Sequence, residues 1–214
     1  MLGDNLLNSE KLPVRHRFHR SIISLGELMG PAFNFGTINK NENPKEYFAA
    51  IVLNKLYSLN ISTENCLLTN DVFLINYLYR YVYELYLKAL YMFSADSDSE
   101  IFLRINNFLE GRNLKIKEYQ EGIRDNLTIP RLKEIHKEQY RKMSEIAHPN
   151  IRSLNLHLHT DSNKQFDFLA STIRLILWHN IELVKLFSFL KLLDIETRLD
   201  RSRLNVLQNS LFNT

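Results

Sequence analysis

The sequence predicts an all-α protein, a bundle of long helices with little or no sheet. Glycine and proline are scarce, at six and five of 214 residues, whereas a turn-rich β protein needs many more of both. Apolar side chains recur three and four positions apart along several long segments, which is the spacing of one face of an α-helix. Phenylalanine and tyrosine are abundant, at 13 and 10 residues, so we expect a bulky core.

The first expected helix spans residues 18–29 and overlaps a basic cluster at residues 11–20. A loop rich in Gly, Asn and Pro follows and ends at Asn43–Pro44, the residue types of a helix N-cap followed by proline at the first helical position. Apolar residues then continue at helical spacing to about residue 59. We therefore expect residues 1–45 to form a basic N-terminal arm with a short helix and a loop.

The segment from residue 72 to about residue 93 is apolar at nearly every position. Its polar exceptions recur at every fourth residue and form one narrow stripe along the expected helix: Asn76, Arg80, Glu84 and Lys88. Such a helix has to be surrounded on most of its sides. It is therefore either the centre of the bundle or part of a subunit interface.

Two shorter helices are expected next. The first is capped by Asp98 or Ser99 and ends at Gly111, because a serine or aspartate cap and a C-terminal glycine are the usual helix boundaries. The second covers residues 114–124, where the apolar pattern is weak.

The rest of the expected bundle lies in the second half of the chain. A helix begins at residues 128–130, and residues 151–160 alternate leucine with Asn and His as an extended segment does. A long helix opens at residues 161–163 and carries apolar residues at helical spacing to about residue 190. We expect one bundle domain over residues 46–193 and a C-terminal tail over residues 194–214 that can form an amphipathic helix.

The stretch "YRKMSEIAHPN", residues 140–150, is the strongest candidate for a functional motif. At about 100° per residue, Arg141 and His148 lie on the same side of the helix, opposite its apolar face, with Ser144 and Glu145 beside them. Two turns, roughly 10 Å, separate them along the axis. The two side chains can meet one phosphate, although they are too far apart to bond each other.

The chemistry of this pair suits cleavage of a phosphodiester. Pro149 disfavours helix at His148, which places the imidazole at a helix C-terminus, where the partial negative charge favours the imidazolium. Histidine near neutrality can give or take a proton, and arginine is suited to holding a phosphate. The alternative is the solvated face of an ordinary amphipathic helix.

The motif resembles the C-terminal signature of the HEPN superfamily, in which an arginine is followed four to six residues later by a histidine. Six residues separate Arg141 from His148 here. The segment "YLYRYVYELYLKALYMF" is similar to the earlier helix of bacterial HEPN-like proteins, with Arg80 and Glu84 in the arginine and glutamate positions. The likeness covers about residues 49–193. A bacterial branch of the group shares a further pattern, formed here by Tyr140, Ser144, His148 and Pro149.

The resemblance implies a helical bundle, usually a homodimer, that acts as a metal-independent endoribonuclease in a bacterial toxin or anti-phage setting. His148 would be the general acid or base for attack of the ribose 2′-hydroxyl, and Arg141 would hold the scissile phosphate. Ser144, Lys142 and Tyr140 would assist, with Arg80 and Glu84 nearby. RNA, a second copy and an antitoxin or defence-system protein are the implied partners.

One departure from the family pattern keeps a second function open. Active members usually place Asn, Asp or His after the arginine, and Lys142 stands there. Lysine cannot accept a hydrogen bond to orient the site. The alternatives are a non-catalytic helical module that binds RNA or protein, and a structural dimerisation domain.

Other residues are weaker candidates for binding RNA. Arg15, Arg17 and Arg20 can hold phosphates or simply form a charged surface. His157 and His159 fall on one side of the expected extended segment, and they face RNA or belong to a solvated loop. No carboxylate and histidine set completes a metal site around them, so we expect no metal.

Composition favours a cytoplasmic protein without a cofactor. The net charge is +3 and no phosphate-binding glycine loop is present. Cys66 is the only cysteine, so no internal disulfide forms. Charged residues interrupt the most apolar segment, and the first residues have no apolar stretch of signal-peptide length. His179, beside Trp178, is expected to be structural.

Overall fold

The computed structural model describes residues 12–29, 38–122, 141, 162–192, 204, 206, 207 and 209. The secondary structure of this part of the chain is helical, and it contains no strand. The prediction of an all-α bundle is therefore confirmed.

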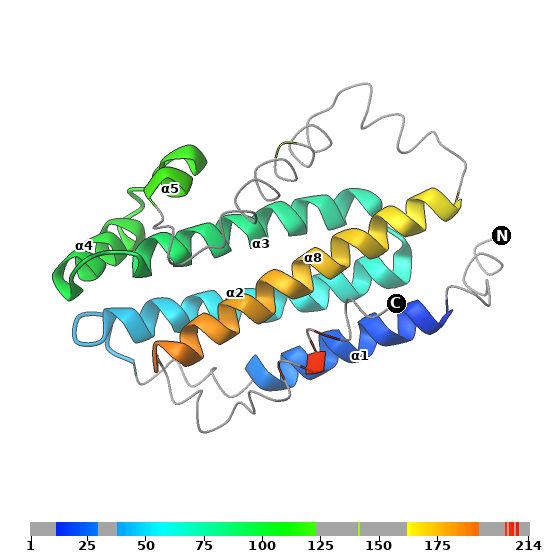
Figure 1. Ribbon diagram of the computed structural model, residues 1–214, viewed down its shortest axis with the longest axis horizontal. Coiled ribbons are helices and arrows are strands. Elements are labelled where there is room, and N and C mark those ends of the chain that lie inside the picture. The colour runs from blue at the N-terminus through cyan, green and yellow to red at the C-terminus, as the bar shows by residue number, and fades with distance from the viewer. Residues whose placement is uncertain are drawn as a thin grey trace.

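Four long helices lie side by side and form the body of the bundle (Figure 1). Three of them run in the same direction, and α2 runs the opposite way between them. The pairing of α3 with α8 is the most extensive contact between elements. The four helices are α1 (Leu12–Met29), α2 (Pro44–Thr69), α3 (Val72–Phe93) and α8 (Ser162–Phe189).

Helix α1 is longer than the sequence analysis predicted, because it begins at Leu12 and not at residue 18. Pro13 stands in the first turn, where proline is tolerated. Phe18, Ile22 and Leu25 are buried in the core that α2, α3 and α8 share. The basic N-terminal segment, expected as an arm with a short helix, therefore contributes a full helix to the core.

Helices α2 and α3 begin close to where they were predicted to begin. Pro44 is the first residue of α2, although the side chain of Asn43 makes no capping hydrogen bond. Asn70 turns the chain with a left-handed φ of 58°, a conformation that asparagine tolerates better than most residues. Asp71 then accepts hydrogen bonds from the backbone N–H groups of Phe73 and Leu74, at 3.0 and 2.8 Å, which satisfies two donors of the first turn.

Helix α4 (Asp98–Leu109) begins one residue earlier than expected. The cap is Ser97, whose hydroxyl accepts from the Glu100 N–H at 3.3 Å, so the prediction of Asp98 or Ser99 as cap was wrong. Ser97 has extended backbone angles while Asp98 is already helical, and a capping residue needs the former. Gly111 follows the helix with a φ of 82°, as a terminating glycine does.

Helix α3 is the centre of the bundle and packs against α2, α8, α4 and α5 (Ile116–Gly122). Three members of the predicted polar stripe are half-buried at the surface: Arg80, Glu84 and Lys88. Asn76 differs, since it is buried and its amide donates to the Val72 carbonyl one turn earlier, at 2.9 Å. A short polar side chain can bond its own backbone in this way, and the side-chain oxygen of Asn76 is buried without a hydrogen-bond partner.

Two arginine–phenylalanine contacts join α1 to α8. The guanidinium of Arg15 lies 5.1 Å from the ring centre of Phe166, and that of Arg174 lies 5.9 Å from the ring centre of Phe18. Each helix thus supplies one cation and one ring. Contacts of this kind contribute about 0.5–2 kcal/mol to stability, and the larger values apply where the cation and the ring are shielded from water.

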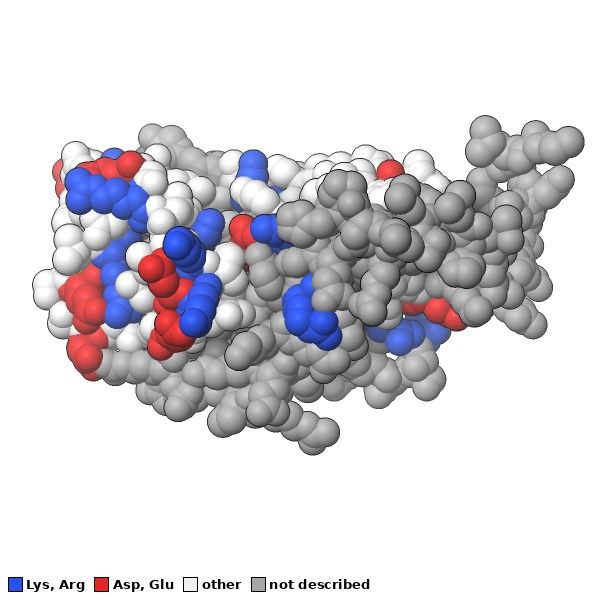
Figure 2. Space-filling model, turned by 90° about the horizontal axis from the view of Figure 1, so that it is seen from above, with Lys and Arg blue, Asp and Glu red and all other residues white. Residues whose placement is uncertain are grey.

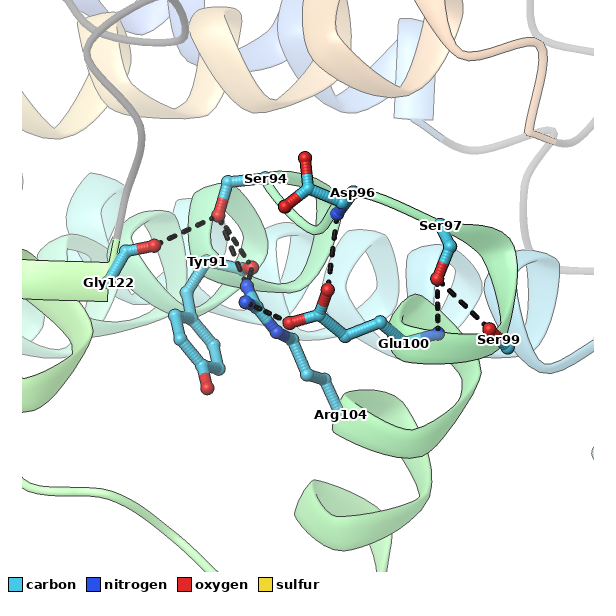
Figure 3. A network of polar contacts seen from close by, with 8 residues as sticks. All are labelled: Tyr91, Ser94, Asp96, Ser97, Ser99, Glu100, Arg104 and Gly122. Carbon is cyan, nitrogen blue, oxygen red and sulfur yellow. Dashed lines mark hydrogen bonds and ion pairs between the residues drawn. The ribbon is translucent and has the colours of Figure 1, made fainter.

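A polar network joins α4 and α5 to the end of α3 (Figure 3). Arg104 donates to the carbonyl of Tyr91, to the hydroxyl of Ser94 at 3.2 Å and to the carboxylate of Glu100 at 2.6 Å. The Ser94 hydroxyl in turn donates to the carbonyl of Gly122 at 3.2 Å. The network satisfies the last carbonyls of α3 and α5, which have no helical partner.

Replacing Gly122 with alanine will lower the free energy of unfolding by about 1–3 kcal/mol. A Cβ at this position would lie 2.6 Å from an atom of the Tyr91 ring. The ring cannot move aside easily, because the guanidinium of Arg104 covers its face at 4.1 Å and Tyr119 meets it edge-on at 5.3 Å. Urea unfolding followed by circular dichroism measures the change.

The matched control is Gly26→Ala in the last turn of α1. A Cβ there would be 3.6 Å from its nearest neighbour, an ordinary contact distance. Alanine has the higher helix propensity, so this variant will raise the free energy of unfolding by about 0.5–1 kcal/mol. A change of the same sign in both variants would contradict the argument.

Candidate functional site

Arg141 is the residue of the motif at positions 140–150 that the structure describes. It is helical and exposed, as the helical wheel predicted. Its guanidinium therefore belongs to the surface and not to the core. The other predicted residues of this site and of the extended segment lie outside the described part of the chain: Tyr140, Lys142, Ser144, His148, His157 and His159.

The described candidate site is one side of α3, which we call the α3 strip. Its members are exposed or half-buried, while the other sides of the helix are packed against the bundle. At about 100° per residue, the strip occupies a sector of about 120°. We define it as Leu74, Tyr77, Arg80, Tyr81, Glu84 and Lys88, and the half-buried Phe73 and Tyr91 lie at its edge.

Arg80 and Glu84 form an ion pair in the middle of this strip. The Nε of Arg80 lies 3.1 Å from Oε1 of Glu84, and the two side chains are 35% and 24% exposed. The two residues are four positions apart, so they face each other on the helix surface. Such pairs stabilise a helix by only about 0.2–0.5 kcal/mol. The role of these residues beside Arg141 and His148 stays a prediction.

Two tyrosines of the α3 strip are exposed, which the sequence analysis missed. Tyr77 is 53% exposed and Tyr81 is 41% exposed. The ammonium of Lys55, an exposed residue of α2, lies 5.8 Å from the centre of the Tyr81 ring. The helical wheel could have predicted their exposure, because Tyr77 and Tyr81 fall within the same sector of the helix as the predicted polar stripe.

Lys88 lies at the end of the α3 strip nearest α4 and α5. Its ammonium is 5.4 Å from the centre of the Phe108 ring and 6.0 Å from that of Tyr119. Both rings belong to the elements that pack on α3. Lys88 therefore has a fixed position at the edge of the strip, and its charge is held close to the surface.

The three N-terminal arginines that were expected to bind RNA have different environments. Arg15 donates to the backbone carbonyl of Leu67 in α2 and contacts Phe166 in α8. Its pKa is lowered because burial disfavours the charged form. Arg15 therefore contributes to the packing of three helices, whereas Arg17 and Arg20 are exposed on the outer side of α1.

His179 is structural, as its position beside Trp178 suggested. Its side chain is fully buried, and Nδ1 donates to the Leu175 carbonyl at 2.6 Å. The ring meets four aromatic rings at centre distances of 4.9–5.7 Å, in edge-on arrangements. These rings are Tyr79, Tyr83, Tyr86 and Trp178.

The buried tyrosines and the buried cysteine of the described residues are unsuited to proton transfer near neutral pH. Burial raises the pKa of Tyr79 and Tyr86 above the usual tyrosine value. Burial, assisted by the negative charge of Asp71, raises the pKa of Cys66 to about 12. The Cys66 thiol therefore stays protonated at neutral pH, and a protonated thiol is a poor nucleophile.

A pocket of about 400 Å³ opens between α1 and α2. Its wall is mostly apolar, and it carries the carboxylates of Glu27 and Glu64. Glu64 also pairs with His19, whose Nδ1 lies 2.6 Å from Oε1. The two carboxylates would repel a phosphate, so this pocket does not suit a nucleic acid.

Charge is mixed at the end of the molecule formed by α4 and α5. Figure 2 shows basic and acidic side chains interleaved there. They form pairs such as Arg112 with Glu110 and Lys117 with Glu121. A surface of alternating sign gives little attraction to a polyanion. In the described ranges, no three His, Cys, Asp or Glu side chains come together in a group that could hold a metal ion.

No protein-family model, no curated protein and no solved structure matches this chain. Among the helices of the described part, none combines the length and the apolar character needed to cross a membrane.

Proposed function

We propose that this chain is a HEPN-like, metal-independent endoribonuclease. The observation that carries the proposal is the position of Arg141, which is helical and exposed. A core position would have ruled out contact between its guanidinium and a phosphate. The half-exposed Arg80–Glu84 pair on α3 agrees with the family layout, and so does the all-α bundle.

In the proposed reaction, His148 removes the proton of a ribose 2′-hydroxyl, and the oxygen attacks the adjacent phosphorus. The bond to the 5′-oxygen of the next nucleotide breaks, that oxygen receives a proton from water, and His148 returns its proton to the solvent. The products are a 2′,3′-cyclic phosphate and a 5′-hydroxyl. Arg141 neutralises the charge that develops on the phosphate oxygens, and Ser144, Lys142 and Tyr140 assist in positioning.

The biological setting follows from the same resemblance. Two copies would form a homodimer in which the two Arg141 faces line one groove. Activity of this kind suits a bacterial toxin or an anti-phage effector, and an antitoxin or defence-system protein would hold it in check.

The second candidate is a non-catalytic helical module that binds RNA. Lys142 favours it, because lysine cannot accept the hydrogen bond that the usual residue provides. The exposed aromatic and basic side chains of the α3 strip favour it as well, since they suit binding without requiring cleavage.

Cleavage of single-stranded RNA by the purified protein will persist in excess EDTA and will leave 2′,3′-cyclic phosphate ends. The reason is that the proposed reaction uses a histidine and an arginine and no metal. End-labelled RNA resolved on a denaturing gel, with enzymatic removal of the cyclic phosphate, measures both. The matched control is an oligomer with 2′-deoxyribose throughout, which will not be cut. Cleavage of that oligomer, or loss of activity in EDTA, would refute the mechanism; binding without cleavage selects the second candidate.

A further inference from the structure

The two outward-facing tyrosines of the α3 strip are unlike the other tyrosines of the same helix. Tyr79, Tyr83 and Tyr86 are buried against α8, whereas Tyr77 and Tyr81 are about half exposed. The buried tyrosines pack α3 against α8 through their contacts with His179. The exposed set leaves part of each ring at the surface, where a further aromatic face can stack on it.

The geometry points to a role in binding: we propose that Tyr77 and Tyr81 form a stacking platform for the bases of single-stranded RNA. This inference rests on the proposed function, because it names the surface by which the RNA is held. The two residues are four positions apart, so they lie on one face about one helical turn from each other. Successive bases can each meet one ring, and every base has a face suited to such stacking.

Three cationic side chains lie on the α3 strip or beside it. Lys55 stands 5.8 Å from the centre of Tyr81, Arg80 lies between the tyrosines in sequence, and Lys88 lies two turns beyond Tyr81. Glu84 offsets one of these charges through its pair with Arg80. A surplus of positive charge remains, as binding of a phosphate backbone requires. Aromatic rings with interleaved cations are the usual composition of surfaces that bind single strands.

The apolar part of the α3 strip is small for a contact between two copies of the chain. An aromatic side chain presents about 150–250 Å² in all, so two half-exposed tyrosines and Leu74 offer on the order of 300 Å². A stable protein–protein interface needs about 800 Å² from each partner. The area suits one or two bases better than a dimer core.

The test compares binding of one RNA by the wild type and by the Tyr77→Ala/Tyr81→Ala double variant. The probe is a fluorescein-labelled, single-stranded 15-mer with 2′-fluoro sugars, which cannot be cleaved through the 2′-oxygen. Fluorescence anisotropy gives the Kd. Loss of one stacked base weakens binding by about 5- to 150-fold, so we expect the double variant to bind at least about tenfold more weakly.

Two control variants separate stacking from other effects. Tyr77→Phe/Tyr81→Phe keeps both ring faces and should bind like the wild type. Phe102→Ala removes a ring of α4 that is 42% exposed, similar to Tyr81, and should leave the Kd unchanged. An abasic 15-mer, which has the backbone but no bases, should bind the wild type and the Tyr77→Ala/Tyr81→Ala variant equally.

Two results would overturn the inference. If the wild type cleaves RNA while the double alanine variant binds the 15-mer equally well, the platform is wrong and the proposed function stands. If light scattering shows that the double variant changes the number of copies in the particle, the strip is an interface between copies. A wild type that neither binds nor cleaves RNA overturns the proposed function itself.

Discussion

Replacing His148 with alanine will reduce RNA cleavage by about 10²- to 10⁴-fold, the usual contribution of a positioned proton-transfer group. We do not expect His179 or Cys66 to substitute for it, since His179 is buried and the Cys66 thiol is protonated at neutral pH. The initial rate of cleavage of a labelled RNA measures the loss. Circular dichroism should show the same helical content in the variant and the wild type.

A partner variant and two controls sharpen this experiment. Arg141→Ala should weaken cleavage strongly, and Arg141→Lys should restore it only in part, because lysine keeps the charge but not the bidentate geometry. The controls replace an exposed histidine of α1 and an exposed, ion-paired arginine after α4: His16→Ala and Arg112→Ala. If His148→Ala cuts RNA as fast as the wild type, the catalytic assignment is wrong.

The largest expected effect on stability is that of His179→Ala, which will lower the free energy of unfolding by about 3–5 kcal/mol, as truncation of a buried aromatic ring does. The imidazole fills the space between α3 and α8, where tyrosine and tryptophan rings surround it. Its removal leaves a cavity that these rings cannot close without leaving their own contacts. Urea unfolding followed by circular dichroism gives the difference.

Two further variants identify the source of this effect. His179→Phe keeps a ring but loses the hydrogen bond to Leu175, so it should cost about 0.5–1.5 kcal/mol from the lost bond. His19→Ala removes a histidine at the surface, where its ion pair with Glu64 is partly exposed. Surface pairs contribute about 0–1 kcal/mol, so this change should be small. Equal effects of His179→Ala and His19→Ala would mean that the aromatic cluster does not hold α3 to α8.

The sequence was sufficient to predict the helices of the body, because their apolar spacing extends over many turns. The starts of α2 and α3 were also predictable, since Asn43–Pro44 and Asp71 have strong preferences for those positions. The beginning of α1 was missed because its first turns are basic, and basic residues occur equally in helices and in arms. Ser97 was missed because serine and aspartate alternate there, and only the backbone angles select the cap.

The environment of each side chain was harder to predict than its secondary structure. Six tyrosines occur in α3, and only their position around the helix separates Tyr79, which α8 covers, from Tyr77, which no neighbour of α3 covers fully. Arg15 and Arg17 are equally basic, yet one lies against a ring and a carbonyl of other helices. These differences depend on contacts between segments far apart in the chain. The outward direction of Arg141 was predictable, because it follows from the periodicity of its own helix.

The pairing of α3 with α8 also has a consequence for biosynthesis. The tyrosines of α3 meet Trp178 and His179 about a hundred positions later in the chain. While the ribosome is still translating the intervening codons, α8 is absent. The apolar side of α3 that packs against it is therefore exposed to solvent. Chaperones bind such nascent surfaces and prevent their association. Helix α8 covers this side of α3 once it has emerged, and the interval before it emerges is when this chain is most vulnerable.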